Sequence, residues 1–570
     1  MVNFDLSTLL LNSILSPVYL AILGLLALLL YVVYDFIRMP YPENLRNIKG
    51  PGVKHWFYGS WPAGAEISGL YEYHLLDTIK TYGPVCTFSE MGRTPILVLA
   101  DHRAVSKVLL QTPYNRVPVI NQMIRRHVGA GLLTKEGAQH RKQRKVAHPA
   151  FTLPSVYNMA PTMHEKSAEL VTRLQKTIAD DRSPGAEIHG TRLDITRDIF
   201  SAALDIIGVV GFNYQFNSLL SQGEPSALEK AFHDCLHTLT TGTPYNGLRI
   251  VFGTPVEVFG RLFRIKEQVL LDDSKRLVRK ISRELVERAQ QEDNSGTDLL
   301  TLMVRANTSD EVKESQRLSD EDLREMVPVF LFAGHETSAT ALSWAMLELM
   351  QPKSGKIMQE RLREELMNDG EEWKSNPGVL DSLPFLDAFT RETLRFYCPV
   401  RNLPRQVPHD DIIPLSRPVQ LRDGTMTSEI RVKKGQVIQF PISWMNRDES
   451  LWGPTGNQFI PERWLPEDHE HAFIQDELVN PVANDLKGVF ANLMTFGAGP
   501  QQCIGVRMAV LEFKIILAAM ITNFEFLLPN LEGEPPVEIA SLDMVVSKPI
   551  LKGKPEGGLT MPVRIKALTV

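Results

Sequence analysis

The sequence predicts a mainly α-helical domain with small peripheral β-sheets, preceded by one N-terminal transmembrane helix. Three observations support this prediction. Apolar residues recur at helical spacing through most of 104–205 and 227–306, short alternating stretches lie outside these ranges, and residues 6–34 contain no charge. We therefore divide the chain into a membrane anchor at residues 1–37 and a single globular domain at residues 38–570.

The anchor prediction depends on an apolar run at residues 18–34, which is long enough to cross a bilayer as a tilted helix. Asp5 precedes the run, whereas Arg38 and Arg46 follow it, so the positive-inside rule places the domain on the cytoplasmic side. A cleaved signal peptide is the competing interpretation, but the start is acidic and the apolar run is too long. The sequon at 307–309 should then stay unglycosylated.

Composition excludes several classes of protein. A net charge of -6 gives no electrostatic reason to expect nucleic acid binding. The 4 cysteines, Cys86, Cys235, Cys398 and Cys503, lie far apart and form no Cys-x-x-Cys pair, so neither a disulfide framework nor a zinc site is predicted. A reducing compartment fits this pattern, and any single cysteine is free to act as a lone ligand.

Strand-like segments flank the helical ranges. Short alternating stretches at 85–89 and 96–100 predict a small sheet, a second strand-rich region spans 412–440, and a third lies near the C-terminus. No internal repeat or long low-complexity linker interrupts the chain. These features predict one domain rather than several.

A long buried helix is predicted to begin at Ser319 and to end near Leu349, because a capping serine and three acidic residues precede an apolar stretch. The stretch is apolar nearly all round, which is typical of a core helix. Pro328 and the Ala333-Gly334 pair interrupt it.

Beside the small residues of this helix stand a carboxylate and a hydroxyl, Glu336 and Thr337. A buried acid is unfavourable unless it is paired or used, so this combination suggests room for a ligand and a route for protons. The alternative is a kinked core helix in which Thr337 bonds back to the preceding turn.

Two further segments carry charge or sulfur in apolar surroundings. Glu392 and Arg395 lie three apart in an apolar run, and Arg463 offers a second guanidinium, although such pairs are usually solvated. Cys503 lies in the glycine-rich loop 496–505, immediately before an apolar helix. Backbone amides and the helix dipole would stabilise its thiolate, and a packed structural thiol is the alternative.

Together these motifs resemble the cytochrome P450 family, in its membrane-anchored, microsomal and fungal-like form. The chain has the pattern Phe-x-x-Gly-x-x-x-Cys-x-Gly at 496–505, preceded in order by 333–338, Glu-x-x-Arg at 392–395 and Pro-Glu-Arg-Trp at 461–464. The resemblance covers nearly everything from about residue 51 onward. It implies the cytochrome P450 fold and a haem-thiolate monooxygenase domain at residues 38–570.

The resemblance also implies a role for each matching residue. Cys503 becomes the axial ligand of the iron in haem b (iron protoporphyrin IX), and Glu336 with Thr337 deliver protons. The loop contributes Phe496 and Gly499 to cofactor binding, and Glu392, Arg395 and Arg463 form a structural network. The residues that match propionate contacts are His140, Arg144 and Arg405.

One position departs from the family pattern. Two residues before the ligand the family usually has Arg or His, whereas this chain has Gln501. A neutral amide can donate a hydrogen bond but supplies no charge, so a weaker contact with a propionate is expected there.

The reaction implied is insertion of one oxygen atom from O2 into an apolar small molecule, such as a terpenoid, a polyketide, a fatty acid or another secondary metabolite. Electrons would come from NADPH through NADPH-cytochrome P450 reductase at the endoplasmic reticulum membrane, with the domain cytosolic and membrane lipid around the anchor. The side chains expected to form a basic docking surface for this partner are Arg141, Lys142, Arg144, Lys145, Arg507 and Lys514.

Two other functions stay open at this point: a reductase-independent haem-thiolate isomerase or dehydratase, and a non-catalytic haem-binding membrane protein. The substrate lining would fall around 117–133, 212–258, 326–336, 400–404 and 544–550, which are mostly apolar. Arg125, Arg126 and His127 would meet an acidic substrate or a propionate, or lie in water.

Overall fold

We analysed a computed structural model of the chain. It describes residues 42–54, 59–60, 71–90, 95–111, 114–221, 253–291, 296–309, 313–368, 370–471, 490–531, 533–543, 545–553 and 558–568, with single positions at 23–24, 26–27 and 30 and others scattered between 228 and 249. The predicted anchor at 1–37 therefore lies, except for five positions, outside the described residues. Within the described ranges, no helix combines the length and the apolar character of a membrane span.

The molecule is built around α16 (Asp320–Leu349), a helix of 30 residues. Ser319 caps its start: the serine hydroxyl accepts from the N–H of Asp322, whose side chain in turn accepts from the N–H of Ser319. Most of its side chains are buried, and Pro328 lies within it. The predicted start, end and burial of this helix are confirmed.

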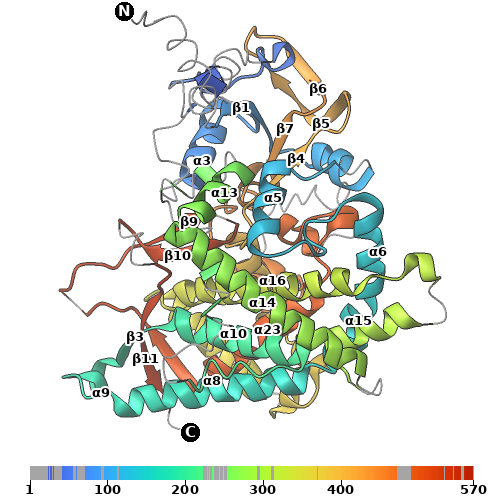
Figure 1. Cartoon of the computed structure of the whole chain (residues 1–570). Coiled ribbons are helices and arrows are strands. Elements are labelled where there is room, and N and C mark those ends of the chain that lie inside the picture. Colours follow the sequence, from blue (N-terminus) through green and yellow to red (C-terminus); the bar gives the residue numbers. More distant parts are fainter. Residues whose placement is uncertain are drawn as a thin grey trace, which may run out of the picture.

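Other helices surround α16 in the lower, larger part of the molecule (Figure 1). The direct neighbours of α16 include α10 (Ile195–Phe212), α14 (Lys266–Gln291), α17 (Ser354–Asn368), α19 (Pro384–Phe396) and α23 (Val506–Asn523). In the described part of the chain, the remaining helices of eight or more residues are α3 (Tyr71–Tyr82), α5 (Pro118–His127), α6 (Gly137–Ala147), α8 (Ala160–Asp180), α13 (Thr254–Leu262) and α15 (Leu299–Thr308).

The closest helix contact is that of α10 with α16, and it depends on a glycine. A Cβ atom on Gly334 would lie 2.6 Å from the Cγ1 atom of Ile207, so only glycine lets the two helices approach this far. The sequence interpretation treated Gly334 as part of a gap for a ligand. That interpretation was wrong for Gly334, because the Ile207 side chain occupies the space.

The described residues form four small sheets at the periphery. A four-stranded sheet has the order β1 (Val85–Ser89), β2 (Pro95–Leu99), β7 (Val437–Pro441) and β4 (Asn402–Gln406), in which only β2 and β7 are parallel. Beside it lies the antiparallel pair β5 (Asp411–Gln420) and β6 (Met426–Val432). The other sheets are β3 (Thr191–Asp194), β11 (Pro562–Ala567) and β8 (Phe524–Leu527), in this order, and the pair β9 (Ile539–Asp543) and β10 (Ser547–Leu551).

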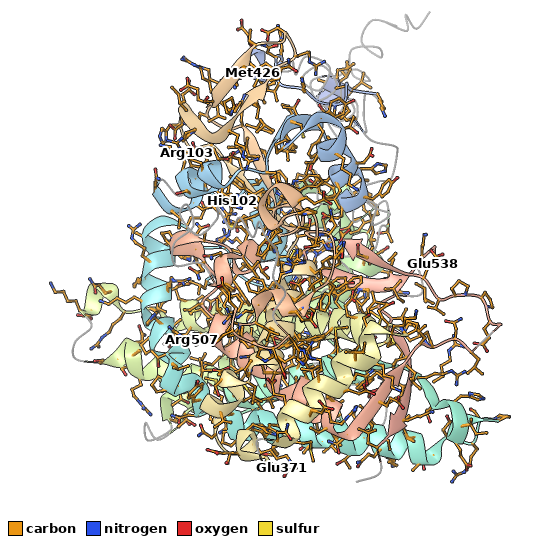
Figure 2. All side chains as sticks on the ribbon, turned by 180° about the vertical axis from the view of Figure 1, so that it is seen from behind. His102, Arg103, Glu371, Met426, Arg507 and Glu538 are labelled. Atoms are coloured by element: carbon orange, nitrogen blue, oxygen red, sulfur yellow. The ribbon has the colours of Figure 1, made fainter. Side chains whose placement is uncertain are left out.

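The pair β5 and β6 marks one end of the molecule, and the opposite end is helical. Figure 2, seen from behind, places Met426 of β6 at one end and Glu371, near the start of α18 (Pro377–Ser382), at the other. The largest hydrophobic core lies between the helices, and a second one lies beneath the four-stranded sheet. The prediction of a mainly helical fold with small peripheral sheets is confirmed.

Candidate active site

Cys503 lies in a loop whose backbone requires glycine. Gly497 and Gly499 have φ angles of +70° and +71°, a region that disfavours side chains. A Cβ atom on Gly499 would also lie 2.1 Å from the carbonyl oxygen of Leu109. The Cys503 N–H donates to the carbonyl oxygen of Phe496 at 2.9 Å, which closes the loop just before α23 begins.

The Cys503 side chain is exposed, although protein atoms lie close to its thiol. This burial of the thiol raises its pKa. The backbone N–H of Gly505 and the charge of Arg144 act in the opposite direction and lower this pKa. Both features favour a thiolate, the form of cysteine that binds a metal. None of the four cysteines, all of which are described, forms a disulfide.

A short exposed patch interrupts the buried length of α16. Ala333 is exposed and Thr337, one turn later, is half-buried, whereas most residues around them are buried. The Thr337 hydroxyl donates to the carbonyl oxygen of Ala333 at 2.7 Å, as the alternative interpretation of this helix expected. Space for a ligand therefore lies over Ala333 rather than over Gly334.

Glu336 is buried and has two cationic or polar neighbours. The Nζ atom of Lys548, on β10, lies 2.5 Å from one carboxylate oxygen, and Nε2 of His335 lies 3.4 Å from the other. Burial raises the pKa of Glu336, but Lys548 and His335 outweigh this effect and bring it to about 2. Glu336 is therefore ionised. Lys548 was not predicted, because nothing in the sequence relates it to a residue more than two hundred positions earlier.

A second buried carboxylate, Glu512, ties α16 to α23. The hydroxyl of Ser338 donates to Glu512 at 2.8 Å, and the other carboxylate oxygen has no hydrogen-bond partner within the described residues. Burial raises the pKa of Glu512 to about 8, although the bond from Ser338 lowers it. This acid is therefore largely protonated at neutral pH, in contrast to Glu336.

A cluster of cations lies near the loop, and the sequence interpretation found only part of it. Gln406 donates its N–H to the carbonyl of Asn115 at 2.8 Å, which brings the neighbouring Arg405 and Arg116 together. His140 faces the same group, since the charge of Arg116 acts on it. Arg116 was missed because it stands alone in the sequence.

The positive charge of this cluster exceeds the negative charge near it among the described residues. Burial lowers the pKa of Arg405 to about 9 and that of Arg116 to about 10, and burial with Arg116 lowers the pKa of His140 to about 4. One guanidinium N–H group on each arginine is buried without a hydrogen bond among the described residues. Only Glu136 offsets the charge nearby. The residues present therefore fit a ligand that carries carboxylates, as haem does.

Arg144 links the cluster to the loop. Its Nη1 atom donates to the carbonyl oxygen of Gln502 at 2.6 Å, so the structure places it beside Cys503. Gln501, the position that departs from the family pattern, has a buried side-chain oxygen without a hydrogen bond. The contact of Arg144 with a propionate stays a prediction.

The predicted Glu392 network is complete. Glu392 accepts two bonds from Arg395 at 2.7 Å, one from Arg463 at 3.2 Å and one each from the Ile460 N–H and the Trp464 indole. Arg395 also donates to three backbone carbonyls. All three charged side chains are buried, so the prediction of a buried network is confirmed and the solvated alternative is wrong.

One residue of the predicted docking surface is buried instead of exposed. Lys514 is buried and pairs with Asp387 at 2.8 Å and Asp381 at 3.1 Å, so it cannot meet a partner. Arg141, Lys145 and Arg507 are exposed as expected.

Comparisons with known proteins agree with this site. The cytochrome P450 family model matches residues 49–554. Cytochrome P450 monooxygenase 205 of Postia placenta is 34% identical, over 92% of this chain and 93% of its own length, and monooxygenase 128 of the same fungus is 32% identical, over 95% and 96%. Cytochrome P450 monooxygenase claU of Ampulloclitocybe clavipes is 26% identical over 92% and 93%.

These matches cover the globular domain almost completely. The family in general binds haem, takes electrons from a reductase and acts on apolar substrates, and its members named above are fungal monooxygenases. The prediction of an oxidoreductase of the monooxygenase type is confirmed. By sequence, fold and matched length, this chain belongs to the cytochrome P450 family.

Proposed function

We propose that this protein is a membrane-anchored haem-thiolate monooxygenase that inserts one oxygen atom from O2 into an apolar small molecule, such as a terpenoid or another secondary metabolite. One observation carries the proposal. Cys503 lies exposed on a loop that requires glycine, and Arg144 connects this loop to the buried Arg116 and Arg405, whose positive charge exceeds that of the nearby Glu136.

The residues of this loop and of the cation cluster would hold haem b. Cys503 would bind the iron, with Phe496 and Gly499 shaping the loop. The propionates would be bound by Arg116, His140 and Arg405. Arg144 lies between His140 and the Cys503 loop. When bound, the haem supplies the activation of dioxygen, and a thiolate ligand favours cleavage of its O–O bond.

Glu336 and Thr337 would move protons. The Thr337 hydroxyl points its proton at the Ala333 carbonyl, so its oxygen is free to accept a hydrogen bond from water in the exposed patch. Glu336 is ionised and can take a proton from water once Lys548 releases it. Replacing Thr337 with Ala should leave the haem spectrum unchanged and divert NADPH electrons into hydrogen peroxide several-fold more than in the wild type. Unchanged coupling in Thr337→Ala would count against this role.

The location and the electron source follow the family. We infer an anchor at residues 1–37 in the endoplasmic reticulum membrane, a cytosolic domain, and NADPH-cytochrome P450 reductase as the donor. The exposed cations Arg141, Lys145 and Arg507 would meet an acidic surface of that reductase. The buried Asn307, which bonds Leu318 at 2.6 Å and 3.0 Å, also leaves no room for a glycan at the sequon.

Consumption of NADPH with purified reductase and candidate apolar substrates tests the proposal. A monooxygenase forms oxygenated product in proportion to the NADPH used. Product without NADPH would instead identify an isomerase or dehydratase. Neither product nor substrate-dependent consumption across a broad panel would favour a non-catalytic haem protein.

A further inference from the structure

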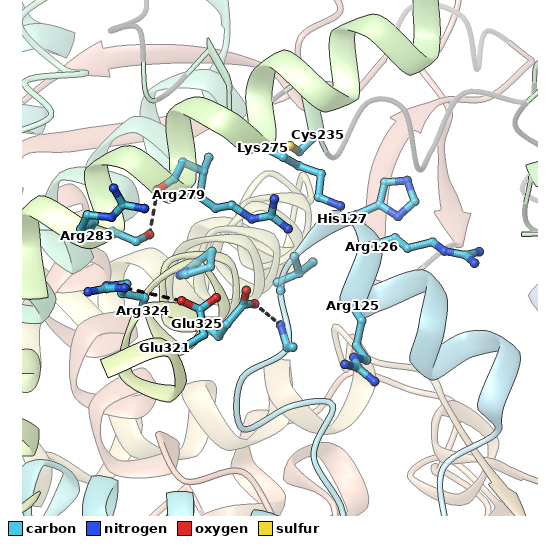
Figure 3. Close-up of a pocket in the computed structure, with 16 residues that line it drawn as sticks. Arg125, Arg126, His127, Cys235, Lys275, Arg279, Arg283, Glu321, Arg324 and Glu325 are labelled. Atoms are coloured by element: carbon cyan, nitrogen blue, oxygen red, sulfur yellow. Dashed lines mark hydrogen bonds and ion pairs between the residues drawn. The ribbon is translucent and has the colours of Figure 1, made fainter. Parts of the chain in front are cut away.

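A cavity lies between the C-terminal end of α5, the middle of α14 and the first turns of α16 (Figure 3). Its volume is about 360 Å³, which is within the range of roughly 300–1,000 Å³ for small-molecule sites. Neither Cys503 nor Thr337 lines it. Part of its lining comes from stretches predicted to surround the substrate, but the cations contributed by α14 have no role assigned so far.

The lining carries an excess of positive charge. It includes two carboxylates, Glu321 and Glu325, and a larger set of cations: Arg125, Arg126, Lys275, Arg279, Arg283 and Arg324. The carboxylates already have partners, because Glu325 accepts from the Ala130 N–H at 2.6 Å and Glu321 pairs with Arg324 at 3.6 Å. They therefore do not neutralise the other cations.

Three of these cations form a stripe along α14. Lys275, Arg279 and Arg283 are spaced four apart and so lie on one face of the helix. In the described part of the chain, none of the three forms an ion pair or a hydrogen bond. Like charges at this spacing destabilise a helix, so helix stability does not explain the stripe.

The acids of α14 serve other cations. Asp273 pairs with Arg276, and Glu284 pairs with Lys280 at 3.9 Å, both outside the stripe. The half-buried Lys275 and the exposed Arg279 and Arg283 have no such ion pair among the described residues, so the side of α14 that carries them is positively charged. An unbalanced cationic face inside a cavity is typical of an anion site.

The view in Figure 3 separates the cations that face the cavity from those that do not. Lys275 and Arg279 extend from α14 toward the middle of the cavity, above Glu325, whereas Arg125 and Arg126 turn away. Arg126 pairs with Glu257 at 3.0 Å. Lys275 is half-buried, and burial together with the charge of Arg279 lowers its pKa.

His127 adds no charge to the cavity. Its Nδ1 atom lies 2.8 Å from the Met123 carbonyl, to which it donates, and Nε2 accepts from Arg249 at 2.9 Å. Both nitrogens are engaged, and burial lowers the pKa of His127 to about 3. The acids whose charges reach Lys275 are Glu257 and Asp272, and both form ion pairs with other arginines. A bound anion would therefore give Lys275 and Arg279 a direct counter-ion.

We propose that this cavity binds a phosphate group, carried either by a free small molecule or by a phospholipid headgroup, with Lys275 and Arg279 as its main contacts. A phosphate offers three oxygens and up to two charges, so it can accept from an ammonium and a guanidinium together. Arg283, further along the stripe, would bind the outer side of the group. This inference goes beyond the proposed oxygenase activity and does not depend on it.

The test uses the full-length, haem-loaded protein at constant ionic strength, because screening changes all such affinities. One arm titrates sn-glycerol 3-phosphate and inorganic phosphate by calorimetry. The other arm measures binding to phosphatidylcholine vesicles with and without phosphatidic acid. The variant is Lys275→Gln/Arg279→Gln, and the matched control is Arg276→Gln/Lys280→Gln, which removes the same charge from the same helix.

The expected result is at least a tenfold loss of phosphate affinity in the variant and less than twofold in the control. If this pattern occurs with the soluble phosphates, the ligand is a free molecule. If it occurs only with phosphatidic acid vesicles, the ligand is a headgroup. Absence of binding in both arms, or an equal loss in variant and control, overturns the proposal. The single variant Arg283→Gln changes an exposed residue and should fold even if the double variant does not. We expect it to lose less phosphate affinity than the double variant.

Discussion

Two buried charge clusters in this protein differ in whether the chain supplies partners for their charges. Around Glu392, every charge meets a partner supplied by the chain: two arginines, one indole and backbone groups. Around neutral His140, the charges of Arg116 and Arg405 repel each other, and Glu136 is the one carboxylate that acts on them among the described residues. A cluster that the chain completes by itself stabilises the fold, whereas a cluster that the chain leaves incomplete indicates a ligand.

Breaking the Glu392 network should have the largest effect on the stability of the protein. Removing Arg395 takes two hydrogen bonds from the buried Glu392 and leaves Arg463 as its one cationic partner among the described residues. Breaking a buried ion pair in this way costs about 3–5 kcal/mol. We expect Arg395→Met to lower the free energy of unfolding by that amount and to reduce the yield of folded protein, measured by denaturant titration. The matched control is Arg391→Met, one turn earlier on α19, whose partly exposed pair with Asp387 should contribute less than about 1 kcal/mol. Equal losses of unfolding free energy in the two variants would show that the buried network stabilises the fold no more than a partly exposed ion pair does.

Removing Arg405 from the second cluster should not destabilise the haem-free protein, but it should weaken haem binding in the loaded protein. Arg405→Met relieves repulsion with Arg116, so the haem-free protein should be as stable as the wild type or more stable. The loaded protein should lose haem at least tenfold faster, because a propionate contact is missing. Thermal unfolding of the haem-free form and transfer of haem to a scavenger protein measure the two effects. Destabilisation of the haem-free form would mean that Arg405 is structural.

Glu512 is an intermediate case, with one neutral partner and a pKa of about 8. Because its folded pKa lies above the unfolded value, its carboxyl group favours folding below about pH 4.5, and this contribution is lost as the pH rises toward 8. Each pKa unit corresponds to about 1.4 kcal/mol. We therefore expect Glu512→Gln to match the wild type in stability at pH 4.5 and to exceed it by a few kcal/mol at pH 8. A constant difference across this range would contradict the assignment.

The smallest effect is expected from adding a charge at Gln501. The variant Gln501→Arg restores the cation that the family usually has, next to a cluster whose positive charge already exceeds the negative charge near it. The haem-free protein should lose about 1 kcal/mol or less, and haem retention should equal or exceed that of the wild type. Weaker haem binding would show that the glutamine is adapted to this chain.

Local patterns were predictable from the sequence. The capped helix α16, the strand β1 and the Cys503 loop follow from residues that are close in sequence, and the structure confirms their bounds. The Glu392 network was also found, because the family motifs mark all three charged members. The division of the chain at residue 38 stays a prediction.

Contacts between distant segments were not predictable. Lys548 and Arg116 have no local pattern, and only the folded sheets bring them to Glu336 and Arg405. Gly334 was misread because a glycine in a helix indicates a close neighbour without telling whether that neighbour is a ligand or, as here, Ile207. Lys514 was misread because helical spacing does not reveal that two aspartates cover it.

The central claim is that Cys503 binds haem iron as a thiolate. The absorption spectrum of the reduced, carbon-monoxide-bound protein tests it most directly, with Cys503→Ala as the comparison. We predict the long-wavelength Soret band typical of thiolate ligation in the wild type and its loss in the variant. A histidine-type Soret band in correctly folded wild-type protein would contradict the claim.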